Sequence, residues 1–180
     1  MDAGHGQPTL DYGVDCKDSE SPYINKCNFD GAFEALDHLY GGLVRPSGGV
    51  LSGQLTEYDQ QEFDTSLFGA SLDQDGGFVY VPEACESGVE CKLHLIFHGC
   101  LQGREFLTPS DEFPKNTGYL EVADANNIIL LFPQIKSSFL GLNPNGCFDW
   151  WGYDGLSYAR KDGPQMSAVK GMIDRVMGRN

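Results

Sequence analysis

The sequence has few basic residues and no long apolar run. Twelve lysines and arginines stand against 26 aspartates and glutamates, which gives a formal net charge of −14. A chain this acidic has no basic surface for phosphate groups, so we expect no nucleic-acid partner. All apolar runs are shorter than the roughly 20 residues of a membrane helix, so we expect no membrane partner either. The 180 residues fit a single domain, 1–180, with a substantial core.

Metal-binding patterns are also absent. No C-x-x-C occurs, and the four histidines and the acidic residues do not fall at the spacing of metal ligands, so we expect no metal and no cofactor. The six cysteines, an even number, instead favour disulfides. Two pairs are close together in turn-rich segments, and the third pair is what remains. The expected disulfides are Cys16–Cys27, Cys85–Cys91 and Cys100–Cys147.

Disulfides would indicate an exported protein. The opening segment MDAGHGQPTL has neither the basic region nor the apolar region of a secretory signal. We therefore expect an extracellular protein whose signal lies upstream of this chain. The alternative is a cytosolic protein with six free thiols.

Hydrophobic patterns predict alternating strands and helices. Residues 1–28 read as irregular, whereas 51–58 and 77–82 read as two neighbouring strands. The runs LHLIF, 93–97, and IILLF, 128–132, are apolar enough to be strands covered on both faces. A helix over 117–126 lies between them and makes this pair of strands parallel.

Two further helices complete the expected α/β layered sheet. The first has Asp30 as its N-cap and ends at Gly41. The last begins at Asp162 and ends at Gly178. Its expected apolar stripe consists of Met166, Val169, Ile173 and Val176. The strands are too few for a complete doubly wound fold, so the domain looks incomplete.

The turn that follows LHLIF is the candidate reactive segment. His98, Gly99 and Cys100 lie beyond the carboxyl end of a strand, where open α/β sheets bind their ligands. α/β-hydrolases place one donor of the oxyanion hole in such a loop, and the backbone N–H of Cys100 is our candidate donor. We expect His98 to brace this turn and His94 to be a packed, hydrogen-bonded residue. An ordinary turn without a catalytic role is the alternative.

A nucleophile to accompany this turn is missing. The G-x-S-x-G pattern that exposes a reactive serine does not occur. Its nearest variants surround Ser52, inside an expected strand, and Ser157, in a loop that no buried strand precedes. We expect neither serine to be the nucleophile, because the strained strand-to-helix turn is what activates the hydroxyl.

Four segments together resemble one enzyme family. They are CKLHLIFHGCLQG, NTGYLEVADANNIILLFPQ, NPNGCFDWWGYDG and KDGPQMSAVKGMI. They are similar to the catalytic domain of extracellular poly(3-hydroxybutyrate) depolymerases, in the order of the circularly permuted, single-domain fungal-type members. The resemblance implies an α/β-hydrolase-like fold of which this chain is the C-terminal part.

The resemblance also assigns roles to individual residues. His5, in GHGQPT, matches the triad base, and the serine and acid of the triad would lie upstream. Trp150 matches an aromatic residue that contributes to substrate binding, whereas we expect Phe148 and Trp151 to pack in the core. A polyester or oligoester is the implied substrate, cleaved through an acyl-enzyme, and the complete protein is expected to be a monomer.

Two alternatives remain open. Feruloyl or acetyl esterases of plant polysaccharide share the His-Gly-Cys type of turn. The chain could also be a non-catalytic binding derivative that kept the sheet and lost the nucleophile. In either case we expect the isolated chain to be inactive as an esterase, because it has no nucleophile.

Overall fold

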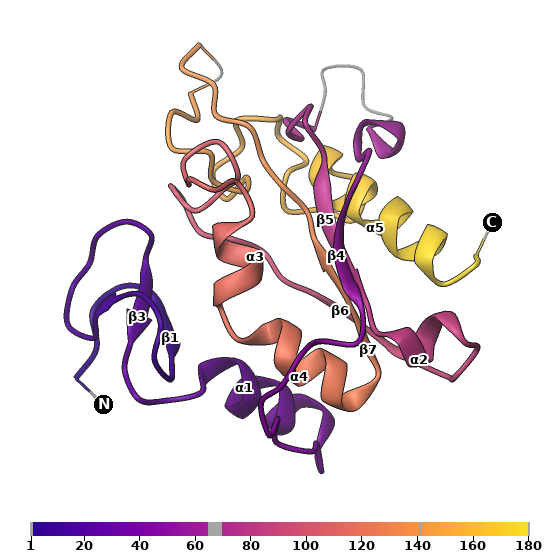
Figure 1. Cartoon of the computed structure of the whole chain (residues 1–180). Coiled ribbons are helices and arrows are strands. Elements are labelled where there is room, and N and C mark those ends of the chain that lie inside the picture. The colour runs from indigo at the N-terminus through magenta and orange to yellow at the C-terminus, as the bar shows by residue number, and fades with distance from the viewer. Residues whose placement is uncertain (1, 65–69, 141, 180) are drawn as a thin grey trace.

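A four-stranded mixed sheet forms the central layer of the computed structural model, which describes residues 2–64, 70–140 and 142–179 (Figure 1). Its strands, in spatial order, are β4 (Gln54–Tyr58), β5 (Gly77–Val81), β7 (Ile128–Phe132) and β6 (Lys92–Leu95). β4 and β5 are antiparallel neighbours, and β6 and β7 are parallel. Both predicted pairings are therefore confirmed.

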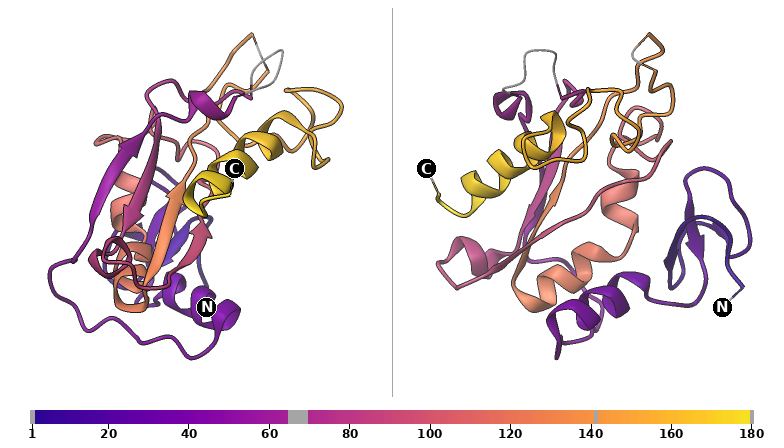
Figure 2. Two further views of the ribbon diagram at one scale, coloured as in Figure 1. Left: turned by 90° about the vertical axis from the view of Figure 1, so that its right-hand side faces the viewer. Right: turned by 180° about the vertical axis from the view of Figure 1, so that it is seen from behind.

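Helices cover both faces of this sheet. α1 (Gly31–Tyr40) and α4 (Tyr119–Asn126) lie on one side, and α5 (Pro164–Val176) lies on the other (Figures 1 and 2). α2 (Glu83–Glu86), α3 (Glu112–Asn116) and the 3-10 turn η1 (Gln61–Phe63) are shorter. The α/β layered architecture predicted from the sequence is thus present. No helix in the described part of the chain is long and apolar enough to cross a membrane.

Local chemistry explains where the first helices start and stop. The Asp30 carboxylate accepts the Phe33 N–H at 3.0 Å, and Gly41 ends α1 with φ of 72°, both as predicted. The predicted start of α4 at Thr117 was wrong. The Thr117 hydroxyl donates backwards to the Phe113 carbonyl at 2.9 Å, so this residue closes α3, and Gly118 with φ of 84° separates the two helices.

The predicted face of α5 also needs correction. The helix starts at Pro164 after Gly163, and its buried residues are Gln165, Ala168 and Met172. Val169 and Val176 are partly buried against the same cluster, whereas Met166 is 51% exposed. The sequence pattern misplaced the stripe because it counted Met166 as core and could not foresee that the polar Gln165 side chain would be buried by hydrogen bonds.

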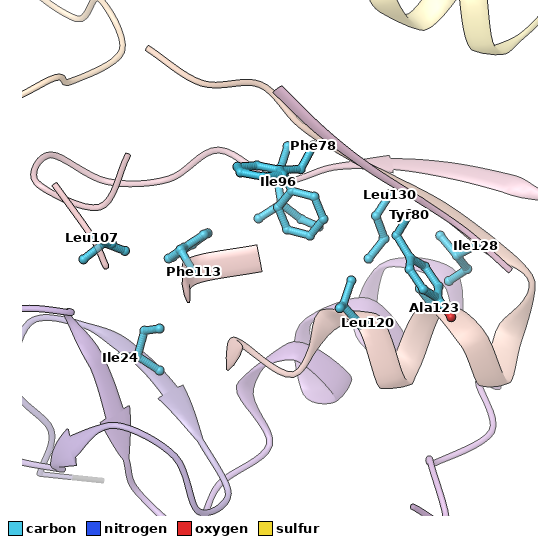
Figure 3. Packing of buried hydrophobic residues seen from close by; sticks show 11 residues of the cluster. Ile24, Phe78, Tyr80, Ile96, Leu107, Phe113, Leu120, Ala123, Ile128 and Leu130 are labelled. Carbon is cyan, nitrogen blue, oxygen red and sulfur yellow. The ribbon is translucent and has the colours of Figure 1, made fainter. Parts of the chain in front are cut away.

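The larger core cluster fills the space between the sheet and α4. Phe78 and Tyr80 of β5 pack with Leu130 of β7 and with Leu120 of α4 (Figure 3). Ile24 joins this cluster from the N-terminal segment, which therefore packs against the main domain. A second cluster lies between the sheet and α5.

The N-terminal segment is not irregular, contrary to the prediction. It contains a three-stranded parallel sheet in the order β1 (Gln7–Thr9), β3 (Ile24–Lys26), β2 (Val14–Asp15). The Asn25 amide donates to the carbonyls of Asp15, Cys16 and Asp18 at 2.7–3.2 Å. Strands of two or three residues are too short to show alternation, so the periodicity of the sequence does not reveal this sheet.

Coverage of the two apolar strands differs. β7 is buried along most of its length, as predicted. β6 is the last strand of the sheet, where Leu93 and Leu95 are half-buried and Phe97, just beyond it, is 50% exposed. The expectation of complete cover on both faces was therefore wrong for LHLIF, because an apolar run does not reveal whether a strand lies at the centre or at the edge.

The three disulfides are those predicted. Their S–S distances are 2.05 Å, 2.02 Å and 2.04 Å for Cys16–Cys27, Cys85–Cys91 and Cys100–Cys147. The first closes the N-terminal sheet and the third joins two loops that are far apart in sequence.

Candidate active site

Two hydrogen bonds fix the peptide groups on either side of Gly99. Its N–H donates to Oε1 of Gln102 at 2.7 Å, and its carbonyl accepts from Nδ1 of His98 at 2.8 Å. The backbone N–H of Gln102 also donates to the Gly99 carbonyl, at 3.2 Å. A Cβ at position 99 would lie 2.6 Å from Oε1 of Gln102, so the absence of a side chain at this position lets the Gln102 amide approach this closely.

The geometry of Gly99 determines the direction of the next N–H. The peptide that joins Gly99 to Cys100 is trans, so its carbonyl and its N–H point in opposite directions. The carbonyl faces the buried imidazole of His98, and the Cys100 N–H therefore points away from it. No acceptor within the described ranges forms a hydrogen bond with this N–H. The turn thus presents one donor to the exterior.

His98 braces the turn, as predicted. It is 4% exposed, and its Nε2 accepts the Ile135 N–H at 3.2 Å. Since Nε2 is an acceptor, the ring proton lies on Nδ1, which donates to Gly99. Burial lowers the pKa of His98 to about 4, against a usual value of 6.5. The ring is therefore neutral near pH 7 and serves as a fixed donor and acceptor. His94 is likewise packed, with Tyr40 as its hydrogen-bond partner at 3.2 Å.

His5 and this turn line the same cavity, which has a volume of about 400 Å³. His5, Gly99, Cys100 and Gln102 all line it, although His5 comes from the N-terminal segment and the others follow β6. The His5 side chain is exposed, its backbone N–H donates to Oγ of Ser19 at 2.9 Å, and its ring lies edge-on to Tyr23. The structure therefore places the two residues singled out for catalysis on the same cavity.

The disulfide fixes this turn to the loop that precedes the tryptophans. Beside the Cys100–Cys147 bond, the Leu101 N–H donates to the Asn145 carbonyl at 2.8 Å. Asn143, which is 1% exposed, accepts the Cys147 N–H and donates to the Cys147 carbonyl, both at 2.9 Å. Cys100 is thus joined to this loop by a covalent bond, and the adjacent Leu101 by a hydrogen bond.

The aromatic loop is partly as predicted. Phe148 packs against Phe97 and His98, with ring centroids 4.9 Å and 5.1 Å apart, so its structural role is confirmed. Trp151 is 39% exposed and does not belong to the core, so that prediction was wrong. Trp150 is 71% exposed and does not line the cavity that contains His5.

Asp149 explains why the two tryptophans remain outside the core. Its Oδ1 accepts the backbone N–H groups of Trp151, Gly152 and Tyr153 at 2.6–3.1 Å. Its Oδ2 accepts the Asp154 N–H at 2.9 Å. One carboxylate therefore satisfies a whole turn of backbone donors, and this turn can hold its shape without burying the indole rings.

The two serines considered in the sequence have no histidine partner in the described part of the chain. Oγ of Ser52 donates to the Asp124 carboxylate at 2.6 Å and accepts the Glu83 N–H at 3.2 Å. Ser157 lies in the turn-rich segment before α5. The described residues also contain no group of three or more His, Cys, Asp or Glu side chains that could hold a metal ion.

Sequence reasoning missed one polar residue of the site, Gln102. Its amide group is buried between the turn and the N-terminal segment, where Nε2 donates to the Tyr23 carbonyl at 2.9 Å. A glutamine in LQG is unremarkable in sequence, because its partner lies 79 positions away.

Comparison with solved structures defines the class. The chain superposes with a TM-score of 0.86 and 37% identity on a polyhydroxybutyrate (PHB) depolymerase from Penicillium funiculosum, and the match covers 99% of this chain and 59% of that protein. A second structure, of a PHB depolymerase variant with one serine replaced by alanine, in complex with an R3HB trimer, matches equally well. The chain therefore has the α/β-hydrolase-like fold of these enzymes over the part that it spans.

Comparison with sequences defines the family. The chain is 43% identical over 177 residues to the poly(3-hydroxybutyrate) depolymerase of Delftia acidovorans, and 38% identical over 172 residues to the polyhydroxybutyrate depolymerase of Talaromyces funiculosus. It spans 34% and 49% of these two relatives, about a third and a half of their length. No family model matches the chain. The chain is a homologue of the poly(3-hydroxybutyrate) depolymerases.

Proposed function

We propose that this chain carries the general base, one oxyanion donor and part of the substrate-binding surface of a serine esterase that cleaves poly(3-hydroxybutyrate) or its oligomers. The observation that supports the proposal most is the shared cavity: His5 and Cys100 lie 95 positions apart in the sequence and both line it. Homology at 38–43% identity supports the polyester as substrate. The complex of a homologous structure with an R3HB trimer supports binding of short oligoesters.

In the proposed reaction a serine hydroxyl attacks the ester carbonyl while His5 takes its proton. The carbonyl oxygen gains negative charge in the tetrahedral intermediate, and the Cys100 N–H donates to it. The alcohol then leaves with the proton from His5, and water hydrolyses the acyl-enzyme by the reverse sequence of proton transfers. Trp150 would contact the polyester chain outside the cavity.

The serine and the acid of the triad are proposed to come from outside these 180 residues. Since the chain spans 59% of the homologous solved structure, much of that fold is supplied by residues that have no counterpart here. The proposal includes the circularly permuted order, with serine and acid before His5. It also includes export from the cell, which the three disulfides support.

The binding part of this proposal can be tested on the isolated chain. An R3HB trimer titrated into ¹⁵N-labelled protein is expected to shift the Cys100 amide and the Trp150 indole resonances. A methyl ferulate titration serves as the comparison, because it tests the alternative of a feruloyl esterase. Shifts with the ferulate alone would favour that alternative, and shifts with neither ester would contradict the proposal.

The catalytic part requires a separate measurement. A fluorophosphonate probe is expected to leave the 180-residue chain unlabelled, since the Ser52 hydroxyl donates a hydrogen bond to the Asp124 carboxylate and has no histidine to take its proton. Labelling at Ser52 or Ser157 would show that the nucleophile lies within the chain. Trimer binding without labelling is also what a non-catalytic derivative would give, so hydrolysis after addition of the missing part of the domain distinguishes the two.

A further inference from the structure

We propose that Gln102 is a positioning residue that holds the oxyanion donor and the catalytic base in one arrangement. The inference rests on the proposed function, because it concerns the relative placement of Cys100 and His5. It is carried by the two ends of a single buried amide. Oε1 of Gln102 accepts from Gly99 at 2.7 Å, and Nε2 donates to the Tyr23 carbonyl at 2.9 Å.

On the side of the turn, Gln102 acts through Gly99. The Gln102 side chain accepts the Gly99 N–H, and the Gln102 backbone N–H donates to the Gly99 carbonyl at 3.2 Å. That carbonyl belongs to the same peptide as the Cys100 N–H. A rotation of this peptide that reorients the Cys100 N–H must break the bonds that the Gly99 carbonyl accepts from the Gln102 backbone and from His98. The side-chain bond from Gln102 holds the preceding peptide, about which such a rotation would turn.

On the other side, Gln102 acts through Tyr23. The Tyr23 carbonyl accepts both Nε2 of Gln102 and the backbone N–H of Gln7, the latter at 2.8 Å. Gln7 begins β1 only two residues after His5, and it pairs with Ile24 of β3. The Tyr23 carbonyl therefore accepts hydrogen bonds both from the Gln102 side chain and from the first residue of β1, the strand that follows His5.

Glutamine suits this position because it combines an acceptor and a donor at the end of one side chain. An ionised glutamate at position 102 would keep an acceptor for Gly99 and would turn the other end into a second acceptor facing the Tyr23 carbonyl. Methionine would remove both bonds at similar length. The residue is 9% exposed, so water does not readily replace either partner.

The two variants give different expected signatures in the full 180-residue chain. In the native background, His5→Ala should displace the Cys100 amide resonance, and the Gly99 amide should be protected from hydrogen exchange. In Gln102→Glu the Gly99 protection should remain and the displacement of the Cys100 resonance should be lost. In Gln102→Met both should be lost.

Gln60 offers a matched control. It is also buried, accepts the Gln134 N–H at 3.1 Å and donates to the Asp73 and Gln134 carbonyls at 3.0 Å and 2.7 Å, and it does not line the cavity. Gln60→Glu should lower stability and leave the response of Cys100 to His5 intact. A merely structural Gln102 would make its variants behave like this control.

Three results would overturn the inference. They are a Cys100 resonance that does not respond to His5 in the native chain, a Gln102→Glu variant that keeps this response, and an unprotected Gly99 amide in the native chain. The last measurement needs no variant and remains decisive if the substitutions prevent folding. Failure of the R3HB trimer to bind would contradict the proposed function and would leave these amide measurements unchanged, so the two can be told apart.

Discussion

Replacement of Cys100 and Cys147 by alanine should destabilise the chain more than removal of either other disulfide. In the chain-entropy model the gain from a cross-link rises with the length of the loop that it closes. The three loops span 47, 11 and 6 positions for Cys100–Cys147, Cys16–Cys27 and Cys85–Cys91. The model then gives losses of about 4, 3 and 2 kcal/mol in the free energy of unfolding.

Urea denaturation of the three double variants measures these losses. The chain contains two tryptophans, Trp150 and Trp151, which follow Cys147 by three and four positions. Their fluorescence reports on the loop that the disulfide holds, and far-UV circular dichroism reports on the whole fold. If both signals change together in every variant, unfolding is two-state and the comparison of free energies is valid.

The same variant tests what the disulfide does for the site. The bond between the Leu101 N–H and the Asn145 carbonyl would still join the two loops in the folded variant. We therefore expect a folded protein with weaker coupling between them, seen as a change in tryptophan emission before global unfolding. A loss smaller than that of the Cys85–Cys91 variant would refute the reasoning from loop length.

Three other predictions follow from single contacts. Because burial lowers the pKa of His98 to about 4, folding favours the neutral ring. The contribution of His98 to the free energy of unfolding is therefore complete above pH 6.5 and is lost as the pH falls toward 4. Urea unfolding at several pH values should show this loss, about 3 kcal/mol, in the native chain and not in His98→Asn. Asp149→Ala should lower the free energy of unfolding by about 2 kcal/mol and increase acrylamide quenching of the tryptophans. Asp149→Asn should be intermediate in both measurements, because it keeps one acceptor. Unchanged quenching would contradict the role of this carboxylate. In thermal denaturation, Gly13→Ala should lower the free energy of unfolding by about 3 kcal/mol, because its Cβ would lie 1.9 Å from the Ile24 carbonyl oxygen at a φ of 104°. Gly99→Ala should lower it by only about 1 kcal/mol, because its Cβ would meet a movable side-chain oxygen. Equal losses would contradict this comparison.

Strong local patterns made much of the fold predictable. The runs 93–97 and 128–132 with a helix between them indicated the parallel pair, and Asp30 and Gly41 indicated both ends of α1. The turn after β6 was identified from its place at the end of a strand. His5 could be chosen only from the family resemblance, because nothing in its neighbours distinguishes it from a solvated histidine.

Long-range contacts made the rest unpredictable. Asn25 organises the N-terminal sheet through three carbonyls, and no periodicity marks such a residue. Trp151 was expected in the core as a packed aromatic residue, yet it is 39% exposed and the hydrogen bonds of Asp149 hold its loop at the surface. Gln102 forms its two side-chain hydrogen bonds only after folding brings Tyr23 and Gly99 to either end of its amide, so the sequence gives no sign of them.

The two edges of the sheet differ in a way that matters for handling the protein. β4 presents the exposed polar side chains of Gln54, Thr56 and Glu57, which discourage a further strand from adding there. β6 instead combines half-buried leucines with the exposed ring of Phe97. Preparations of these 180 residues alone should therefore form concentration-dependent aggregates through the β6 side, and a peptide strand that pairs with β6 should dissolve them.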